Sequence, residues 1–251
     1  MLIDNPAGNY RFLTGIAPYS CGVVAMPGFE IIHVTFHKPV PYKKAFDQIW
    51  AHLKSVKRPP HALCAIQLRI PAPLSSDGFA AFNAEYQDVL VQNDLLFEGK
   101  NPIARTNISP ACLALTEPSL YAFSYTVPIR DRTLTPTFIV AGAGDLNDQT
   151  HLSESAIVRP NETTPEALQE KAACVMQVMQ ERVTGLKVSW NDATTVEVYS
   201  VYPIHTFLKD TLLDQFDEAA IHGVHWHFGH PPIEGLAFEM DLRGVRQALW
   251  K

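Results

Sequence analysis

Two charged side chains, one in each half of the chain, are the strongest candidates for chemistry. Arg105 stands in the segment Ala104-Arg105-Thr106-Asn107, and Glu239 stands in Phe238-Glu239-Met240-Asp241. A guanidinium holds a carboxylate through two parallel hydrogen bonds, which also fix its orientation. A carboxyl group can position water and carry protons to a leaving group. The two residues therefore predict a site for a small carboxylate, provided that the fold brings them together.

Each of these side chains also has a plainer explanation. An arginine at the start of a strand often pairs with a surface acid. An acid in an alternating strand often points into solvent, because charged side chains are seldom buried without a partner. The distinction depends on whether Arg105 and Glu239 meet in one pocket.

The composition excludes several classes of function. The chain has 251 residues, 47% of them hydrophobic and 18% charged, which suits one large globular domain or two small ones. The net charge is −6, and no dense group of Lys and Arg is present. Binding to nucleic acid depends on such groups, so a ribonuclease role is disfavoured and we expect no nucleic-acid partner.

The N-terminal residues and the cysteines point to the cell interior. Met1 to Pro6 lacks the basic and apolar regions of a secretion signal, and no apolar stretch approaches the length of a membrane span. We therefore expect a cytoplasmic protein without membrane contact. The four cysteines are widely spaced and form no CxxC pair, so the pattern predicts neither a zinc knuckle nor a disulfide framework.

The apolar periodicity repeats one order of elements in both halves of the chain. In the first half, strands are expected at 31–36, 63–70, 104–115 and 120–127, and helices at 42–56 and from 76. In the second half, strands are expected at 138–143, 193–201, 225–227 and 236–245, and helices from 164 and at 207–216. The polar, proline-bounded stretch 128–136 serves as the linker. The repeat predicts two domains, residues 1–130 and 131–251.

The last expected strand alternates cleanly between apolar and polar side chains. Phe238, Met240 and Leu242 point one way, while Glu239 and Asp241 point the other. The apolar face should meet the helices, which places Glu239 on the opposite face of its sheet.

Several short segments, in the same order along the chain, resemble the Rid family of small deaminases, also called the YjgF or reactive-intermediate deaminase family. The matching segments are Ile16-Ala17-Pro18-Tyr19, Phe79 to Tyr86, Pro102-Ile103-Ala104-Arg105, Leu186 to Ala193 and Phe238-Glu239-Met240-Asp241. Together they cover most of both halves. The resemblance implies an α+β fold of two tandem Rid-like modules, each a mixed β-sheet backed by two helices, with a homotrimer built through the sheet faces.

The resemblance also implies an activity. It is hydrolysis of a small carboxylated enamine or imine, such as a 2-aminomuconate-like acid, to a keto acid and ammonia, with no cofactor. Arg105 would hold the carboxylate, Glu239 would handle water and protons, and Tyr19 would line the pocket as a third catalytic residue. Further substrate contacts are expected from the side chains of Asn83 and Asn107, the backbone at Ala141 and Gly142, and His225 and His227.

The sequence departs from the Rid pattern in both halves. Tyr121 to Tyr125 has no acid where that family has its glutamate, and the segment before Pro231 has His222 or Gly223 where the arginine belongs. Each module alone would lack one of the two groups, so the expected pocket is composite. The alternative is a non-catalytic member of the family that binds a small acid or a protein.

Two further motifs carry less weight. His222, His225, His227 and His230 lie close together, and a His-x-His strand can ligate zinc, but no nearby acid or cysteine completes a metal motif. We therefore predict no metal. The run Ala141-Gly142-Ala143-Gly144-Asp145 lacks the third glycine and the following helix of a dinucleotide loop.

Overall fold

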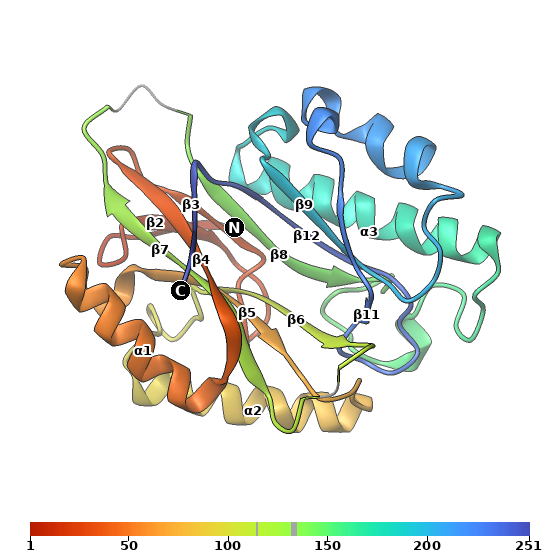
Figure 1. Cartoon of the computed structure of the whole chain (residues 1–251), viewed down its shortest axis with the longest axis horizontal. Helices are drawn as coiled ribbons and strands as arrows, with labels where there is room; N and C mark the ends of the chain where they lie inside the picture. Colours follow the sequence, from red (N-terminus) through yellow and green to blue (C-terminus); the bar gives the residue numbers. More distant parts are fainter. Residues whose placement is uncertain (114, 132–134) are drawn as a thin grey trace.

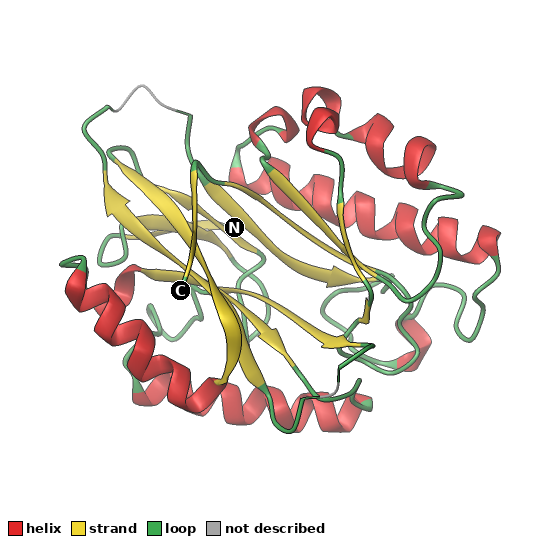
Figure 2. Cartoon of the chain, in the orientation of Figure 1, coloured by secondary structure: helices red, strands yellow, loops and turns green. Residues whose placement is uncertain are grey.

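Two mixed β-sheets lie face to face, and helices cover their outer faces (Figures 1 and 2). The computed structural model describes residues 1–113, 115–131 and 135–251. Helices α1 (Tyr42–Ser55) and α2 (Ser76–Gln92) lie on one side, and α3 (Pro165–Leu186) lies on the other. Short 3₁₀ segments are found at Pro60–Ala62, Glu154–Ala156 and Trp190–Asp192.

The first sheet has seven strands, in the order β1-β2-β3-β8-β12-β9-β10. Their bounds are β1 Leu2–Asn5, β2 Tyr10–Leu13, β3 Gly22–Ala25, β8 Phe138–Gly144, β12 Glu239–Gly244, β9 Thr195–Tyr199 and β10 His225–His227. The second sheet has six strands, in the order β11-β6-β5-β7-β4-β13. Their bounds are β11 Gly229–His230, β6 Ala104–Pro110, β5 Leu63–Arg69, β7 Ser119–Pro128, β4 Phe29–Pro41 and β13 Gln247–Trp250.

Both sheets contain strands from both halves of the chain, so the expectation of two small Rid-like modules is wrong. Strands β1 to β3 join β8 of the second half, and β13 pairs in parallel with β4 of the first half. Alternation identifies a strand but not its partner, and the short strands β1 to β3 and β13 were missed. The division of the chain at 130/131 stays a prediction, although strands from either side of it pair with each other. Residues 132–134 of the expected linker lie outside the described residues.

Helices α1 and α2 pack on the six-stranded sheet through apolar faces. Ile49 and Leu53 of α1 and Tyr86 of α2 are buried with Leu68 and Phe123 of the sheet. The Ser75 side chain caps α2 by accepting a hydrogen bond from the backbone N–H of Gly78 at 3.2 Å. This cap sets where α2 begins, and the helix carries Asn83 and Tyr86 on its buried face.

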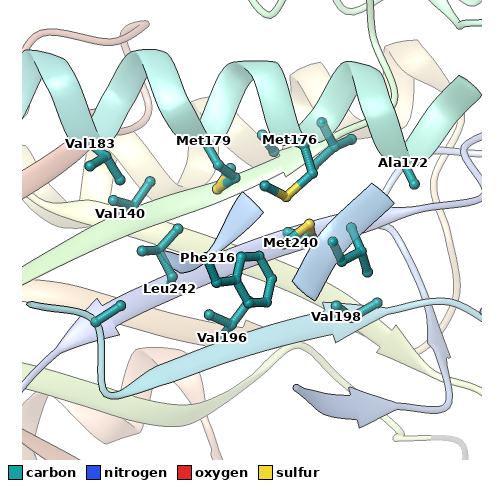
Figure 3. Packing of buried hydrophobic residues seen from close by; sticks show 14 of the residues in the cluster. Val140, Ala172, Met176, Met179, Val183, Val196, Val198, Phe216, Met240 and Leu242 are labelled. Carbon is teal, nitrogen blue, oxygen red and sulfur yellow. The ribbon is translucent and has the colours of Figure 1, made fainter. Parts of the chain in front are cut away.

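Helix α3 covers the seven-stranded sheet (Figure 3). The Thr164 side chain caps its N-terminus, Pro165 opens it, and Lys187 ends it in the left-handed conformation, with φ 60°. The labelled side chains that fill this layer are Val140, Ala172, Met176, Met179, Val183, Val196, Val198, Phe216, Met240 and Leu242. Within the described residues, no helix is sufficiently long and hydrophobic to span a membrane.

Two expectations about the second half have different outcomes. The alternation of the last strand is confirmed, because Met240 and Leu242 pack under α3 while Asp241 contacts Gln67 of the facing sheet. The regular helix expected at 207–216 is wrong. A single π turn, Leu208–Leu212, is followed there by 3₁₀ segments at Leu213–Gln215 and Asp217–His222.

A buried ion pair ties α3 to the beginning of β12. Lys171 Nζ lies 2.8 Å from Asp145 Oδ2, and both side chains are fully enclosed. Asp145 Oδ1 accepts hydrogen bonds from the backbone N–H groups of Ala237 and Phe238, each at 3.0 Å. Asp145 thus fixes the chain immediately before Glu239.

Replacing Lys171 should destabilise the fold strongly. In Lys171→Met the Asp145 carboxylate stays buried without its cation, and the free energy of unfolding should fall by about 3–5 kcal/mol. Urea unfolding measures the change. The matched control is Lys209→Met, whose side chain is 76% exposed and 2.9 Å from Asp214, and which should leave the stability nearly unchanged because water screens this ion pair. Equal effects of the two substitutions would contradict the anchoring role of Lys171.

Candidate active site

Arg105 and Glu239 line a single cavity. The cavity has a volume of about 30 Å³, and its polar lining also includes Tyr19, Asn107 and Gln149. Its apolar lining includes Phe79 of α2 and the loop side chains Leu146, Leu152, Ile233 and Leu236. The residues that the sequence placed in separate halves therefore meet at one buried site.

Arg105 is buried inside a group of aromatic rings. Its guanidinium carbon lies 4.8 Å from the ring centre of Tyr86, 4.9 Å from that of Tyr19, and 5.7 Å from those of Phe79 and Phe82. The aromatic faces attract the cation and hold it in place. Burial lowers the pKa of Arg105 from its usual value, but a guanidinium keeps its proton in proteins.

The hydrogen-bonding capacity of Arg105 is only partly used. Its Nη2 donates to Asn83 Oδ1 at 2.6 Å, while Nη1 is buried without a partner. Within the described residues no acid forms an ion pair with Arg105, so the plainer explanation, pairing with a surface acid, is wrong. A buried cation with a free donor facing a cavity suits an anionic ligand.

Asn107 adds a second unsatisfied polar group to the cavity. Its side chain is 3% exposed, and neither Oδ1 nor Nδ2 has a hydrogen-bond partner. Buried amides are normally bonded, because an unmade hydrogen bond costs about 1–3 kcal/mol. Asn107 and Arg105 therefore present unused polar atoms in the same space.

Glu239 lies on the face of β12 that meets the other sheet, and it is 4% exposed. Burial, followed by the charge of Asp241, raises the pKa of Glu239 well above its usual range. Asp145 adds to this rise, while Arg182 and Arg105 oppose it. The Glu239 carboxyl consequently keeps its proton at a pH where an exposed glutamate has lost it.

Gly142 makes room for the Glu239 side chain. A Cβ at position 142 would collide with Glu239 Oε1 and would lie 3.0 Å from Thr106 Cγ2. The carbonyl groups of Ala141 and Gly142 accept hydrogen bonds from Arg182 Nη1 at 2.8 and 3.0 Å. The backbone of β8 is thus held against Glu239 on one side and α3 on the other.

Arg182 was missed by reasoning from the sequence. Its position, like that of Lys171, falls on the apolar stripe of α3 that includes Met179 and Val183. A charged residue on a core-facing stripe is unusual, because burial of a charge requires a partner. That misplaced charge was the signal that would have identified Arg182.

The remaining expected site residues fall in different places. Tyr19 lines the cavity with its ring beside Arg105, and Asn83 supports Arg105 from α2. Ala141 borders the space between the sheets. The lining of the cavity, as far as the chain is described, contains neither His225 nor His227.

The histidine cluster is spread over two sheets. His225 and His227 lie on β10 of the seven-stranded sheet, and His230 lies on β11 of the six-stranded sheet. The ring of His227 stacks on Tyr199 with centres 5.0 Å apart. Within residues 1–113, 115–131 and 135–251, no three His, Cys, Asp or Glu side chains are grouped to hold a metal ion.

Comparison with known proteins gives one family. The family model described as 2-aminomuconate deaminase CnbZ matches residues 2–249. The 2-amino-5-chloromuconate deaminase of Comamonas testosteroni is 38% identical over 238 residues, which cover 95% of this chain and 94% of that protein. Among solved structures, a chorismatase covers 90% of this chain and 77% of its own at a TM-score of 0.44 and 12% identity. A cyanuric acid hydrolase covers 88% and 69% at a TM-score of 0.38 and 10% identity.

The resemblance to the Rid family is therefore corrected, because a different family model matches nearly the whole chain. The short motifs that suggested it, such as Pro102 to Arg105, are too brief to distinguish families. The expectations of tandem modules and of a homotrimer rested on that resemblance and lose their support with it.

Enlarging Gly142 should damage the site more than the fold. In Gly142→Ala the new methyl group displaces the Glu239 carboxyl, so turnover should fall by about 10- to 100-fold. Steady-state rates measure turnover, and thermal unfolding measures the stability of the fold. The control Gly78→Ala adds the same methyl group near Ser75 at the start of α2, away from Glu239. Unchanged turnover in Gly142→Ala would show that the position of Glu239 is unimportant.

Proposed function

The chain belongs to the 2-aminomuconate deaminase CnbZ family, and on this premise we propose that it hydrolyses a small carboxylated enamine or imine of the 2-aminomuconate type. The observation that carries the proposal is the meeting of Arg105 and Glu239 at one buried cavity. The reaction releases ammonia and leaves a keto acid. The names of the family and of the Comamonas relative support this class of substrate.

Arg105 binds the carboxylate next to the carbon that carries nitrogen. Its free Nη1 and its position among aromatic rings favour a planar anion. Asn83 holds the guanidinium through Nη2, and Asn107 offers an amide to the same ligand. Tyr19 closes the site beside the guanidinium. These contacts orient the reacting carbon toward Glu239.

Glu239 begins the reaction as an acid. Its proton moves to the enamine carbon and produces an iminium ion, and Glu239 becomes a carboxylate. Water then attacks the iminium carbon and loses a proton to Glu239, which forms a carbinolamine. Glu239 next protonates the amine. The C–N bond breaks, the hydroxyl proton returns to Glu239, and ammonia leaves, so the acid is restored and all protons balance.

The electrostatic environment supports this starting state. Burial and the neighbouring acids raise the pKa of Glu239, which favours a protonated carboxyl before substrate binds. A carboxylic acid with a raised pKa is suited to give and recover a proton near neutral pH. An imine substrate first takes the Glu239 proton on its nitrogen, which gives the same iminium ion and a Glu239 carboxylate, and the water-addition step then follows as before.

Substrate binding requires movement of the apolar cover. A cavity of about 30 Å³ has room for two or three water-sized probes, about 10–15 Å³ each, and not for a six-carbon diacid. Leu152 comes from the loop before α3, and Ile233 and Leu236 come from the loop before β12. These side chains separate the site from the surface and exclude water once the substrate is held.

A binding protein without turnover is the competing function. That alternative requires Arg105 and Glu239 to lie apart, because a pocket that has lost its activity need not keep the carboxylate-binding and proton-transferring side chains together. Their shared cavity favours the enzyme.

A cytoplasmic location stays a prediction.

Arg105→Lys should weaken substrate binding. Lysine keeps the charge but loses the paired donors, so kcat/KM for 2-aminomuconate should fall by about 10- to 100-fold, mostly through KM. Initial rates of ammonia release measure the loss. The control Arg159→Lys alters a surface arginine paired with Glu162 and Glu170 and should leave the rates unchanged. An unaltered KM in Arg105→Lys would remove Arg105 from substrate binding.

Glu239→Gln should abolish proton transfer while keeping the shape of the side chain. Turnover should fall by about 10²- to 10⁴-fold. In the wild type the protonated form is active, so kcat/KM should be constant at low pH and decline as pH rises through the raised pKa of Glu239. The exposed control Glu85→Gln should retain full activity. A decline toward acid, with none toward alkali, would reverse the assigned role.

A further inference from the structure

A second group of ionisable side chains lies between the two sheets, outside the cavity lining. The interface is apolar around Phe12, Ile31 and Ala65. Farther along it, Gln67 of β5 faces Glu197 and Tyr199 of β9 and Asp241 of β12, and these side chains are at most 8% exposed. Two buried carboxyl groups side by side are costly unless partners or a proton compensate them.

The contacts among these four side chains form a closed ring. Tyr199 Oη lies 2.7 Å from Glu197 Oε2 and 3.0 Å from Asp241 Oδ2. Gln67 Nε2 lies 2.7 Å from the same Glu197 oxygen and 3.2 Å from the same Asp241 oxygen. The hydroxyl and the amide therefore both bridge the two carboxyl groups.

The ring has one hydrogen too few if both acids are ionised. A tyrosine hydroxyl carries one hydrogen and a glutamine amide nitrogen carries two, so three hydrogens face four contacts. A proton on one carboxyl group completes the ring, because Tyr199 Oη can accept it as well as donate. Turning the Gln67 amide over would remove two donors and increase the deficit.

Asp241 is the acid that carries this proton. Glu197 Oε1 lies 3.0 Å from Arg243 Nη1, whose charge favours the ionised form of Glu197, and 3.7 Å from His227 Nε2. Burial pushes the pKa of Glu197 up, but the charge of Arg243 and the hydrogen bond from Tyr199 bring it well below its usual range. Burial and then the charge of Glu197 raise the pKa of Asp241 to about 7.

Asp241 is also close to the catalytic acid. Glu239 and Asp241 are two positions apart on the same face of β12 and pair in register with Tyr199 and Glu197. Thr106 is near both acids: it flanks Gly142 together with Glu239, and it lines a second small cavity together with Asp241. A charge on Asp241 therefore acts directly on Glu239.

We propose that Asp241 is a positioning residue, which shares one proton with Glu197 through Tyr199 and Gln67 and thereby sets the protonation of Glu239. The pair gives the site a charge that changes in the neutral range. When Asp241 ionises, its negative charge strengthens the hold of Glu239 on its proton. The role assigned to Glu239 rests on the proposed function, whereas the proton on Asp241 does not.

The groups that face the two acids are arginines, one ion pair and His33, and His227 of β10 lies 3.7 Å from Glu197. Glu239 faces Arg105 of β6, Arg182 of α3 and Asp145 beyond β8, which is paired with Lys171. Asp241 faces Arg243 of its own strand and shares the second small cavity with His33 of β4 and Arg105. Burial, followed by the charge of Arg243, lowers the pKa of His33 to about 3, so His33 stays neutral.

Infrared spectroscopy of the protein without substrate tests the shared proton. The carbonyl band of a protonated carboxyl group moves when that residue type is labelled with ¹³C. At pH 6, labelling aspartate in the wild type should move one such band, and Asp241→Asn should remove it. Asp88→Asn, the same change on the exposed face of α2, should leave it in place. If aspartate labelling moves no band at pH 6, the shared proton is overturned without reliance on any variant.

The influence on Glu239 is tested by titration of the same protein. Labelling glutamate identifies the Glu239 band, and its midpoint should fall by about one pH unit in Asp241→Asn, because a neighbouring negative charge is removed. The alkaline decline of kcat/KM should shift downward with it. A midpoint equal to that of the wild type would overturn the positioning role. Failure to release ammonia together with shifted bands would instead overturn the proposed function and leave the shared proton standing.

Discussion

The structure depends on the burial of carboxyl groups between two β-sheets. Strand β12 packs hydrocarbon under α3 on one face and presents Glu239 and Asp241 to the opposite sheet on the other. Charges in such a position require partners or protons, because their loss of hydration is not otherwise offset. The compensation comes from the hydrogen bonds of Gln67 and Tyr199 to Asp241. The positive charges of Arg182, near Glu239, and of Arg243, near Asp241, add to it.

This constraint also links the two halves of the chain. Arg105 comes from β6 and Glu239 from β12, in different sheets. The sheets keep their relation because each contains strands of the other half, with β1 to β3 on one side and β11 and β13 on the other. Because strands from both halves of the chain build each sheet, the distance between Arg105 and Glu239 depends on the packing of both sheets.

The expected elements show where sequence reasoning is strong. The helices near 42–56 and from 76 and 164 were found, because their periodicity and caps are local. The expected helix at 207–216 was wrong, although its apolar residues Phe207, Leu212 and Phe216 are buried as a helix would bury them. Apolar spacing identifies the residues that face the core, while the local backbone can adopt tighter or wider turns.

The sequence by itself identified Arg105 and Glu239 as candidate site residues, and its alternation determined which face of β12 carries Glu239 and Asp241. Only the tertiary structure decided that the two share a cavity, that Arg182 supports it, and that His225 and His227 do not line it. It also replaced two expected modules with two interleaved sheets. The physical reason is that side-chain alternation is set by neighbouring residues, whereas strand pairing and sheet packing are selected by contacts between distant segments.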